Sequence, residues 1–318
     1  MTGTPPQEQK IPLLVLVGPT AVGKTAFSIE LAQRLNGEII SADSVQVYRY
    51  LDIGTAKPTL EEKRLVPHHL IDTVVPSVNF TVYDYQRLAR YKIGEIHARG
   101  KLPMLVGGTG LYVKAVLDGF TFSSRKSNTQ IRERLQEELT ARGKDYLYRL
   151  LREQDPKSAE HIHPNDVRRV MRALEFIYLT GEPIWVQKER TEKKDSPYKP
   201  LIFGLYMTRE QLYSRINMRT DKMIEQGLLN EVKGLLHNGY DKNMKALQAL
   251  GYRHMIAHLE GEWNLETALL YLKRDTRRYA KRQLTWFCAD SRIRWSHIKM
   301  GDNINNHLDN IYTQLAGF

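Results

Sequence analysis

The stretch LVLVGPTAVGKTAFSIELAQRL, residues 14 to 35, decides the fold. A short apolar run over 11–17 ends in a glycine, and the pattern Gly-x-x-x-x-Gly-Lys-Thr then fills 18–25. Apolar side chains recur at helical spacing over 25–35. A buried strand, a glycine-rich turn and a helix in this order are typical of a P-loop. The sequence therefore predicts a polyphosphate site.

The turn itself supplies the predicted diphosphate-binding residues, which are Gly18, Pro19, Thr20, Ala21, Val22, Gly23, Lys24 and Thr25. Backbone N–H groups and the helix dipole hold phosphate oxygens in such a turn. Lys24 adds a point charge, and the hydroxyl of Thr25 is a candidate Mg²⁺ ligand. A chance glycine turn is the alternative, but the flanking strand and helix disfavour it.

Strand patterns follow at 37–44, 69–75 and 102–110, and a helical pattern occupies 83–99. Repeated strand–helix units predict a parallel sheet flanked by helices. From about Ser123 the sequence becomes charged and leucine-punctuated, with amphipathic helical patterns at 129–153 and 165–181.

The last third of the chain again combines strand and helix patterns. It follows a polar, proline-punctuated segment at 188–200, which we expect to be a flexible connection. It contains a strand pattern at 201–207 and helical patterns at 209–237, 246–259 and 264–289. We predict a P-loop NTPase-like α/β core, residues 1–122 plus 199–318, with an inserted all-helical subdomain at 123–198.

Composition narrows the class of protein. One cysteine, Cys288, excludes a disulfide framework and cysteine-based zinc sites, so we expect it to be a packing residue in a reducing compartment. The longest apolar run is far too short to span a bilayer, and we expect a cytoplasmic monomer. The net charge is +11, and residues 199–318 hold 18 basic and 12 acidic side chains, which fits a polyanionic partner.

The predicted sheet edge lacks an acidic residue at the position where most P-loop proteins carry one. Phosphoryl-transfer enzymes carry a metal-holding aspartate after a second strand, but the strand at 102–108 ends in Leu-Val-Gly-Gly-Thr-Gly. Asp43 is the nearest acid, and it should lie beside the P-loop if its strand neighbours the first one. We interpret it as a general base or metal partner, with a turn or helix-cap aspartate as the alternative. Diphosphate as a leaving group would explain this pattern.

Seven segments together resemble those of the tRNA dimethylallyltransferases, also called tRNA isopentenyltransferases. They are GPTAVGKT (18–25), ISADSVQVYRYLDIGTAKPT (40–59), PHHLIDTVVP (67–76), VGGTGLYVKAVLDG (106–119), HPNDVRRVMRALE (163–175), LGYRHM (250–255) and RRYAKRQLTWF (277–287). The resemblance implies transfer of a dimethylallyl group from dimethylallyl diphosphate to N6 of adenosine 37 of tRNA, with Mg²⁺ required. It also implies that the helical insertion helps to bind the anticodon stem-loop.

The resemblance assigns roles to three residues of the core. Asp43 corresponds to the base for the adenine amine, Thr25 to the catalytic threonine, and Arg219 to an arginine near the diphosphate. A solvated position on a helix is the alternative for Arg219.

The predicted tRNA-binding residues come from four segments. They are Asp43, Ser44, Val45, Gln46, Thr109, Arg168, Arg169, Val170, Met171, Arg172, Arg274, Arg278, Lys281 and Arg282. The last four share one helical face by their spacing of three and four. We expect Tyr279, Trp286 and Phe287, which lie among them, to pack in the core, with stacking on bases as the alternative.

Two other functions share parts of this pattern. An adenine-nucleotide isopentenyltransferase would use the same loop and Asp43 but would not need the helical insertion. A small-molecule kinase would bind ATP at the loop but would need an acid after the strand at 102–108.

Overall fold

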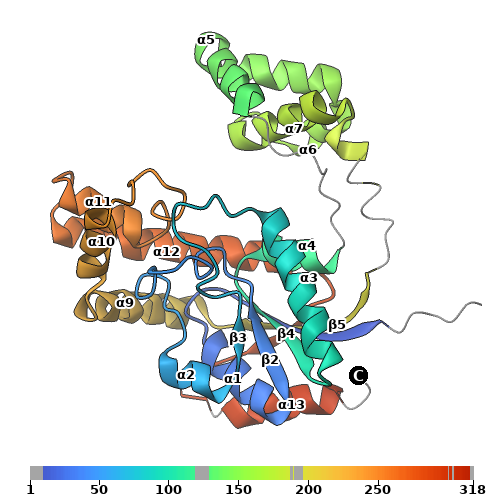
Figure 1. Cartoon of the computed structure of the whole chain (residues 1–318), viewed down its shortest axis with the longest axis vertical. Coiled ribbons are helices and arrows are strands. Elements are labelled where there is room, and N and C mark those ends of the chain that lie inside the picture. Colours follow the sequence, from blue (N-terminus) through green and yellow to red (C-terminus); the bar gives the residue numbers. More distant parts are fainter. Residues whose placement is uncertain are drawn as a thin grey trace, which may run out of the picture. The chain divides into compact units, whose positions relative to one another are not determined.

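A computed structural model describes residues 10–118, 129–186, 189, 196–299, 301–302 and 304–315 of the chain (Figure 1). The chain forms two compact units, residues 1–117 with 197–318 and residues 118–196. The expected boundary at 122/123 and most of the expected connection at 188–200 lie outside the described residues. Within the described ranges, no helix is long and apolar enough to cross a membrane.

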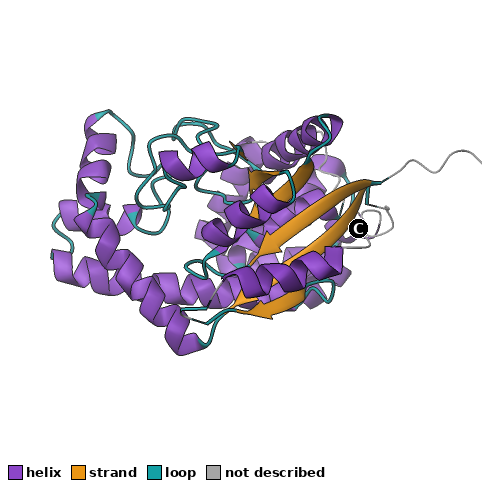
Figure 2. Ribbon diagram, turned by 90° about the horizontal axis from the view of Figure 1, so that it is seen from below, coloured by secondary structure: helices purple, strands orange, loops and turns teal. Residues whose placement is uncertain are grey.

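The larger unit is built on one six-stranded parallel sheet in the order β3-β2-β4-β1-β5-β6. The strands are β1 Ile11–Val17, β2 Gly37–Ser41, β3 His68–His69, β4 Leu102–Gly107, β5 Tyr198–Tyr206 and β6 Arg294–His297. The middle strands are buried on both faces, as their unbroken apolar runs require. Figure 2 shows this sheet between layers of helices. The predicted P-loop NTPase-like α/β fold is confirmed.

Helices cover both faces of the sheet. They are α1 Lys24–Arg34, α2 Leu60–Leu65, α3 Val82–Ala98, α4 Gly110–Leu117, α9 Arg209–Glu225, α10 Leu228–His237, α11 Tyr252–Leu259, α12 Leu265–Cys288 and α13 Ile304–Leu315. One core joins α1 and α13 to one face of the sheet. The other joins α3, α4, α10 and α11 to the opposite face.

The smaller unit is all-helical and has its own core. Its helices are α5 Thr129–Gln154, α6 Pro156–His161 and α7 Val167–Thr180. Leu135, Leu147 and Leu174 are fully buried between them. Gly143 interrupts α5 with a φ of 78°. The predicted end of the second helix is confirmed, because α7 stops at Gly181 in the left-handed conformation.

Two predicted elements of the core are wrong in extent. The strand expected at 69–75 is only two residues long, because Leu70 and Asp72 adopt φ values of 61° and 53°, which a strand cannot contain. The helix expected over 209–237 is two helices, separated at Gly227, whose φ is 97°.

Other differences lie near the carboxyl end of the chain. The helix expected at 246–259 begins only at Tyr252, after a series of turns. Strand β6 and helix α13 have no predicted counterpart. The short polar sequence RWSH of β6 lacks the apolar alternation that marks a strand.

Candidate functional site

A cavity of about 620 Å³ opens at the carboxyl ends of β1, β2 and β4, where open parallel sheets bind ligands. Its wall combines the P-loop with residues from distant helices. The lining includes Thr20, Ala21, Gly23, Lys24, Thr25, Asp43, Gln46, Arg219, Tyr279 and Gln283.

The P-loop backbone takes a conformation that depends on its two glycines. Gly18 and Gly23 have φ values of 151° and 104°, in the region that side chains rarely adopt. A Cβ at Gly18 would also lie 2.6 Å from the carbonyl oxygen of Leu205 on β5. Helix α1 begins at Lys24, so its amino end points into the cavity with the loop.

Lys24 carries the main positive charge of the loop. Its Nζ donates to the carbonyl oxygens of Gly18, at 3.0 Å, and Pro19, at 2.8 Å. Burial lowers the pKa of the Lys24 ammonium to about 8, while the nearby Asp43 opposes this shift and Arg219 adds to it. Three ionisable groups from separate parts of the chain therefore interact electrostatically in the cavity.

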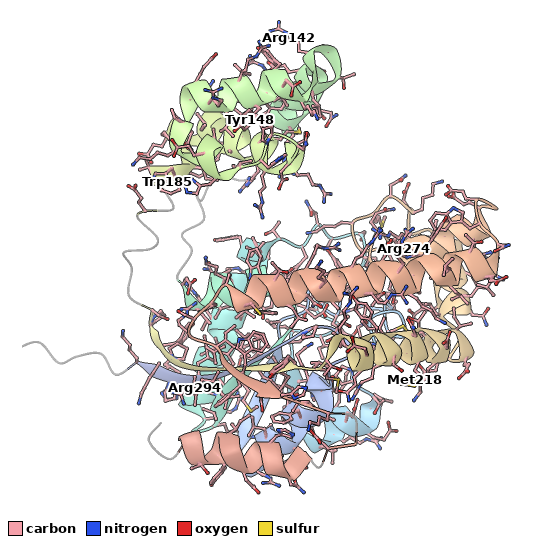
Figure 3. The ribbon with its side chains drawn as sticks, turned by 180° about the vertical axis from the view of Figure 1, so that it is seen from behind. Arg142, Tyr148, Trp185, Met218, Arg274 and Arg294 are labelled. Carbon is pink, nitrogen blue, oxygen red and sulfur yellow. The ribbon has the colours of Figure 1, made fainter. Side chains whose placement is uncertain are left out.

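Arg219 lies on α9 and turns inward. Its Nη1 donates to Thr20 Oγ1 at 3.3 Å, and its Nη2 donates to the carbonyl oxygen of Thr55 at 3.5 Å. Burial lowers the pKa of its guanidinium, and Asp43 opposes that shift. The alternative of a solvated arginine is therefore wrong. By contrast the preceding residue, Met218, is half exposed (Figure 3).

Asp43 follows β2, and it is both a turn residue and a cavity residue. Its Oδ1 accepts hydrogen bonds from the backbone N–H groups of Val45, at 2.8 Å, and Gln46, at 3.2 Å. Among the described residues, no group donates a hydrogen bond to Oδ2. One oxygen thus fixes the carboxylate, and the other is available to a ligand in the cavity.

Asp43 was expected beside the P-loop if β2 neighbours β1, and that condition is not met, because β4 lies between the two strands. Asp43 nevertheless lines the same cavity as the P-loop, and β4, which ends at Gly107 with Gly108 directly after it, separates the two. A Cβ at Gly107 would lie 2.2 Å from the carbonyl oxygen of Ala42. The missing acid at the end of this strand therefore has a structural reason: no side chain fits there.

Sequence reasoning missed Gln283, although it lies in the segment 277–287. Its Oε1 accepts from the N–H of Thr20, and its Nε2 donates to the carbonyl oxygen of Gly108, both at 2.9 Å. This buried amide ties α12 to the P-loop. A Cβ at Gly108 would lie 2.2 Å from Nε2, so the paired glycines of GGTG were the available signal.

The aromatic residues of α12 differ in their surroundings. Phe287 is buried in the core as expected, but Trp286 is 42% exposed. Tyr279 lines the cavity rather than the core. Burial raises the pKa of its hydroxyl to about 12, and hydrogen bonds with Thr109 and Gln283 act in the opposite direction. Core packing is thus right for one of the three.

The predicted tRNA contacts beside Asp43 form one connected group. The N–H of Ser44 donates to Thr109 Oγ1 at 3.0 Å, and Gln46 Nε2 donates to the carbonyl oxygen of Thr55 at 3.2 Å. Val45 is half-buried against the core. Ser44 and Thr109 therefore join the ends of β2 and β4 beside the cavity.

The predicted basic face of α12 is largely exposed, since Arg278, Lys281 and Arg282 are open to solvent. Arg274, labelled in Figure 3, is half-buried; its Nε donates to Asp275 Oδ1 at 2.9 Å, and its guanidinium lies over the ring of Tyr271.

The predicted contacts in the helical unit are mixed. Arg168 and Arg169 are exposed on α7, and Arg172 is paired with Glu175 at 3.0 Å. Met171 is half-buried. Val170 is 1% exposed and packs in the core of this unit, so its side chain is removed from any surface that RNA could touch.

No cluster of three His, Cys, Asp or Glu side chains suited to a metal occurs among the described residues. Among the oxygen groups that line the cavity are the hydroxyl of Thr25 and the carboxylate of Asp43. Both are hard donors of the kind that Mg²⁺ prefers.

Comparison with known proteins identifies the family to which a chain with this cavity belongs. A family model described as IPP transferase matches residues 46–290. The chain belongs to the IPP transferase family. Its relatives include the tRNA dimethylallyltransferase of Alkaliphilus metalliredigens, 49% identical over 96% of this chain and 97% of that protein, and that of Bacillus licheniformis, 48% identical over 97% and 98%.

Solved structures of family members have the same fold. The full-length tRNA isopentenylpyrophosphate transferase of Bacillus halodurans is 47% identical, with a TM-score of 0.73 over 97% of this chain and 96% of that one. A eukaryotic dimethylallyltransferase acting on tRNA is 32% identical, with a TM-score of 0.77 over 90% and 74%. The chain is therefore a transferase, as its sequence predicts.

Proposed function

We propose that this protein transfers the dimethylallyl group of dimethylallyl diphosphate to N6 of adenosine 37 in tRNA and releases diphosphate. The observation that carries the proposal is the cavity in which Lys24, Arg219 and Asp43 meet at the P-loop. Two cations suit a diphosphate, while glycines replace the acid that a phosphoryl-transfer enzyme holds after β4. Membership of the IPP transferase family supports the same reaction.

In the proposed reaction the bond between C1 of the allyl group and the diphosphate oxygen breaks. Its electron pair leaves with the diphosphate, and the lone pair of N6 forms the new carbon–nitrogen bond. Lys24, Arg219 and the loop amides stabilise the negative charge that develops on the leaving group. The carboxylate of Asp43 accepts the proton that N6 loses.

A bound Mg²⁺ ion fits this cavity. Mg²⁺ is usually held by one or two protein oxygens together with substrate phosphates, so the absence of a carboxylate cluster among the described residues is no obstacle. The hydroxyl of Thr25 would hold it, and Asp43 is within the same cavity. The ion would supply further neutralisation of the diphosphate charge.

The acceptor is proposed to be an anticodon stem-loop. An adenine stacked in such a loop must leave the stack to reach Asp43, at a cost of a few kcal/mol. The exposed cations of α12 and α7 would bind the surrounding phosphates, and Ser44, Gln46 and Thr109, which are connected to Asp43 and its loop, would contact the extruded base.

The deciding experiment supplies Mg²⁺ and radiolabelled dimethylallyl diphosphate with tRNA, AMP or ATP in separate reactions. We expect label in tRNA, at the adenosine on the 3′ side of the anticodon. A tRNA in which guanosine replaces that adenosine is the matched control and should stay unlabelled. Label in AMP but not in tRNA would instead identify an adenine-nucleotide isopentenyltransferase, and phosphate transfer from ATP would identify a kinase.

A further inference from the structure

Glu231, in the first turn of α10, accepts four hydrogen bonds from groups outside its own helix. Its Oε2 accepts from the backbone N–H groups of Asp52, at 3.1 Å, and Ile53, at 2.8 Å. Its Oε1 accepts from the N–H of Gly54, at 3.3 Å, and from the hydroxyl of Tyr252, at 2.6 Å. One carboxylate thus gathers three consecutive backbone donors and a side chain.

These contacts fix the conformation of the loop over 51–56. The N–H groups of residues 52–54 point at α10 and are partly buried or exposed, and because they share one acceptor, its removal breaks several hydrogen bonds at once. Tyr252 is fully buried, so water cannot replace Glu231 as the acceptor of its hydroxyl hydrogen bond. A Cβ at Gly54 would lie 2.5 Å from the Tyr252 ring, which shows how closely the loop approaches α11.

The other side of the same loop faces the cavity. The carbonyl oxygen of Thr55 accepts from Arg219 Nη2 at 3.5 Å and from Gln46 Nε2 at 3.2 Å. Thr55 and Ala56 line the cavity, whereas Glu231 stands behind the loop. A shift of α10 would therefore move the Thr55 carbonyl oxygen that holds Arg219 and Gln46.

We propose that Glu231 is a positioning residue that holds Arg219 in place through the backbone of residues 52–55. A displaced loop would remove the Thr55 carbonyl from Arg219 and, among the residues that the structure describes, leave Thr20 as the one hydrogen-bond partner of the guanidinium. Arg219 would then meet the diphosphate less well in both binding and reaction. The inference rests on the proposed function, because that function assigns Arg219 to the diphosphate.

The test is a double-mutant cycle with Glu231→Gln, Arg219→Ala and the pair, measured first on the affinity for inorganic pyrophosphate by calorimetry. Glu231→Gln keeps the size of the side chain but replaces one acceptor oxygen with an NH₂ group. We expect it to weaken pyrophosphate binding and to slow dimethylallyl transfer at saturating substrates by ~10- to 100-fold. In the Arg219→Ala background we expect the same change to act by less than about twofold.

Two controls separate positioning from general loss of structure. Glu210→Gln removes an exposed carboxylate from the first turn of α9 and should change nothing. Tyr252→Phe removes one donor and leaves the three backbone bonds, so its effect should stay within a few-fold. The tRNA affinity of Glu231→Gln should match that of the wild type. Additive effects of Glu231→Gln and Arg219→Ala would overturn the inference.

The outcomes remain distinguishable from failure of the proposed function. If the wild type transfers no dimethylallyl group, that function is wrong, but the pyrophosphate cycle still tells whether Glu231 acts through Arg219. If thermal unfolding shows that Glu231→Gln does not fold, Glu231→Asp takes its place in the cycle, since it keeps the charge and shortens the reach to the loop.

Discussion

The cavity and the surface of α7 use the same kinds of charged side chain in opposite ways. In the cavity, Lys24 and Arg219 lie close to Asp43 and are half-buried, and burial lowers the pKa of both cations. On α7, Arg168 and Arg169 are exposed to solvent. Charges that face one another in a low dielectric interact strongly, whereas exposed charges are screened. The first arrangement suits chemistry, and the second suits reversible contact with a polyanion.

The largest effect should follow from removal of the cavity carboxylate. We expect Asp43→Ala to lower turnover by ~10²–10⁴-fold, the range for a lost general base, and to leave tRNA affinity within a few-fold. Single-turnover transfer and filter binding measure the two quantities. Asp145→Ala removes an exposed aspartate of α5 and should be silent in both assays. Turnover near that of the wild type would show that Asp43 is not the general base.

A smaller loss is expected when the second cation is removed. Arg219→Ala should lower the transfer rate by ~10²–10³-fold, because a buried donor to the leaving group disappears. Arg209→Ala, on the exposed start of the same helix, should keep wild-type rates, since its guanidinium lies over Tyr213 rather than in the cavity. Equal rates for the two variants would break the contrast between buried and exposed arginines.

The pH dependence of diphosphate binding should report Lys24. Because its pKa in the fold is about 8, the ammonium is present below that pH and is lost as pH rises through it. We expect the affinity for dimethylallyl diphosphate, measured by calorimetry without tRNA, to fall above pH 8 by up to about tenfold per pH unit.

The matched variant for this measurement is Lys24→Met, which removes the charge and keeps much of the side-chain length. It should bind more weakly at pH 7 and show no fall between about pH 7 and pH 9.5. A wild-type affinity that stays constant over that range would show that the charge of Lys24 does not hold the diphosphate.

The smallest effects belong to the exposed cations. Arg169→Ala on α7, and Arg278→Ala or Lys281→Ala on α12, should weaken tRNA binding a few-fold. Each should also reduce the salt dependence of log K by up to ~0.7–0.9 units per lost phosphate contact. Transfer at saturating tRNA should not change. Arg134→Ala on α5, outside the predicted contacts, is the control. An equal change in its tRNA affinity and salt dependence would show that the predicted cations do not form the RNA-binding surface.

Elements encoded by contiguous residues were predictable. The P-loop, α1 and α7 follow from short patterns whose physics is local: apolar spacing, glycines at positive φ and helix ends. The clustering of Asp43 with the loop was predicted only on the condition that β2 lies beside β1, and the structure reaches it with β4 between the two strands. Strand order depends on packing between distant segments, which a periodic pattern does not contain.

The sequence by itself determined the phosphate cradle, the parallel α/β class and the family to which the chain belongs. Only the tertiary structure decided what completes the cradle. Gln283 reaches Thr20 across 263 residues, and Glu231 reaches Asp52 across 179. Such contacts arise because sheet packing brings α12 and α10 to the carboxyl edge of the strands. A side chain's neighbours in space, unlike its neighbours in the chain, are set by the burial of the whole core.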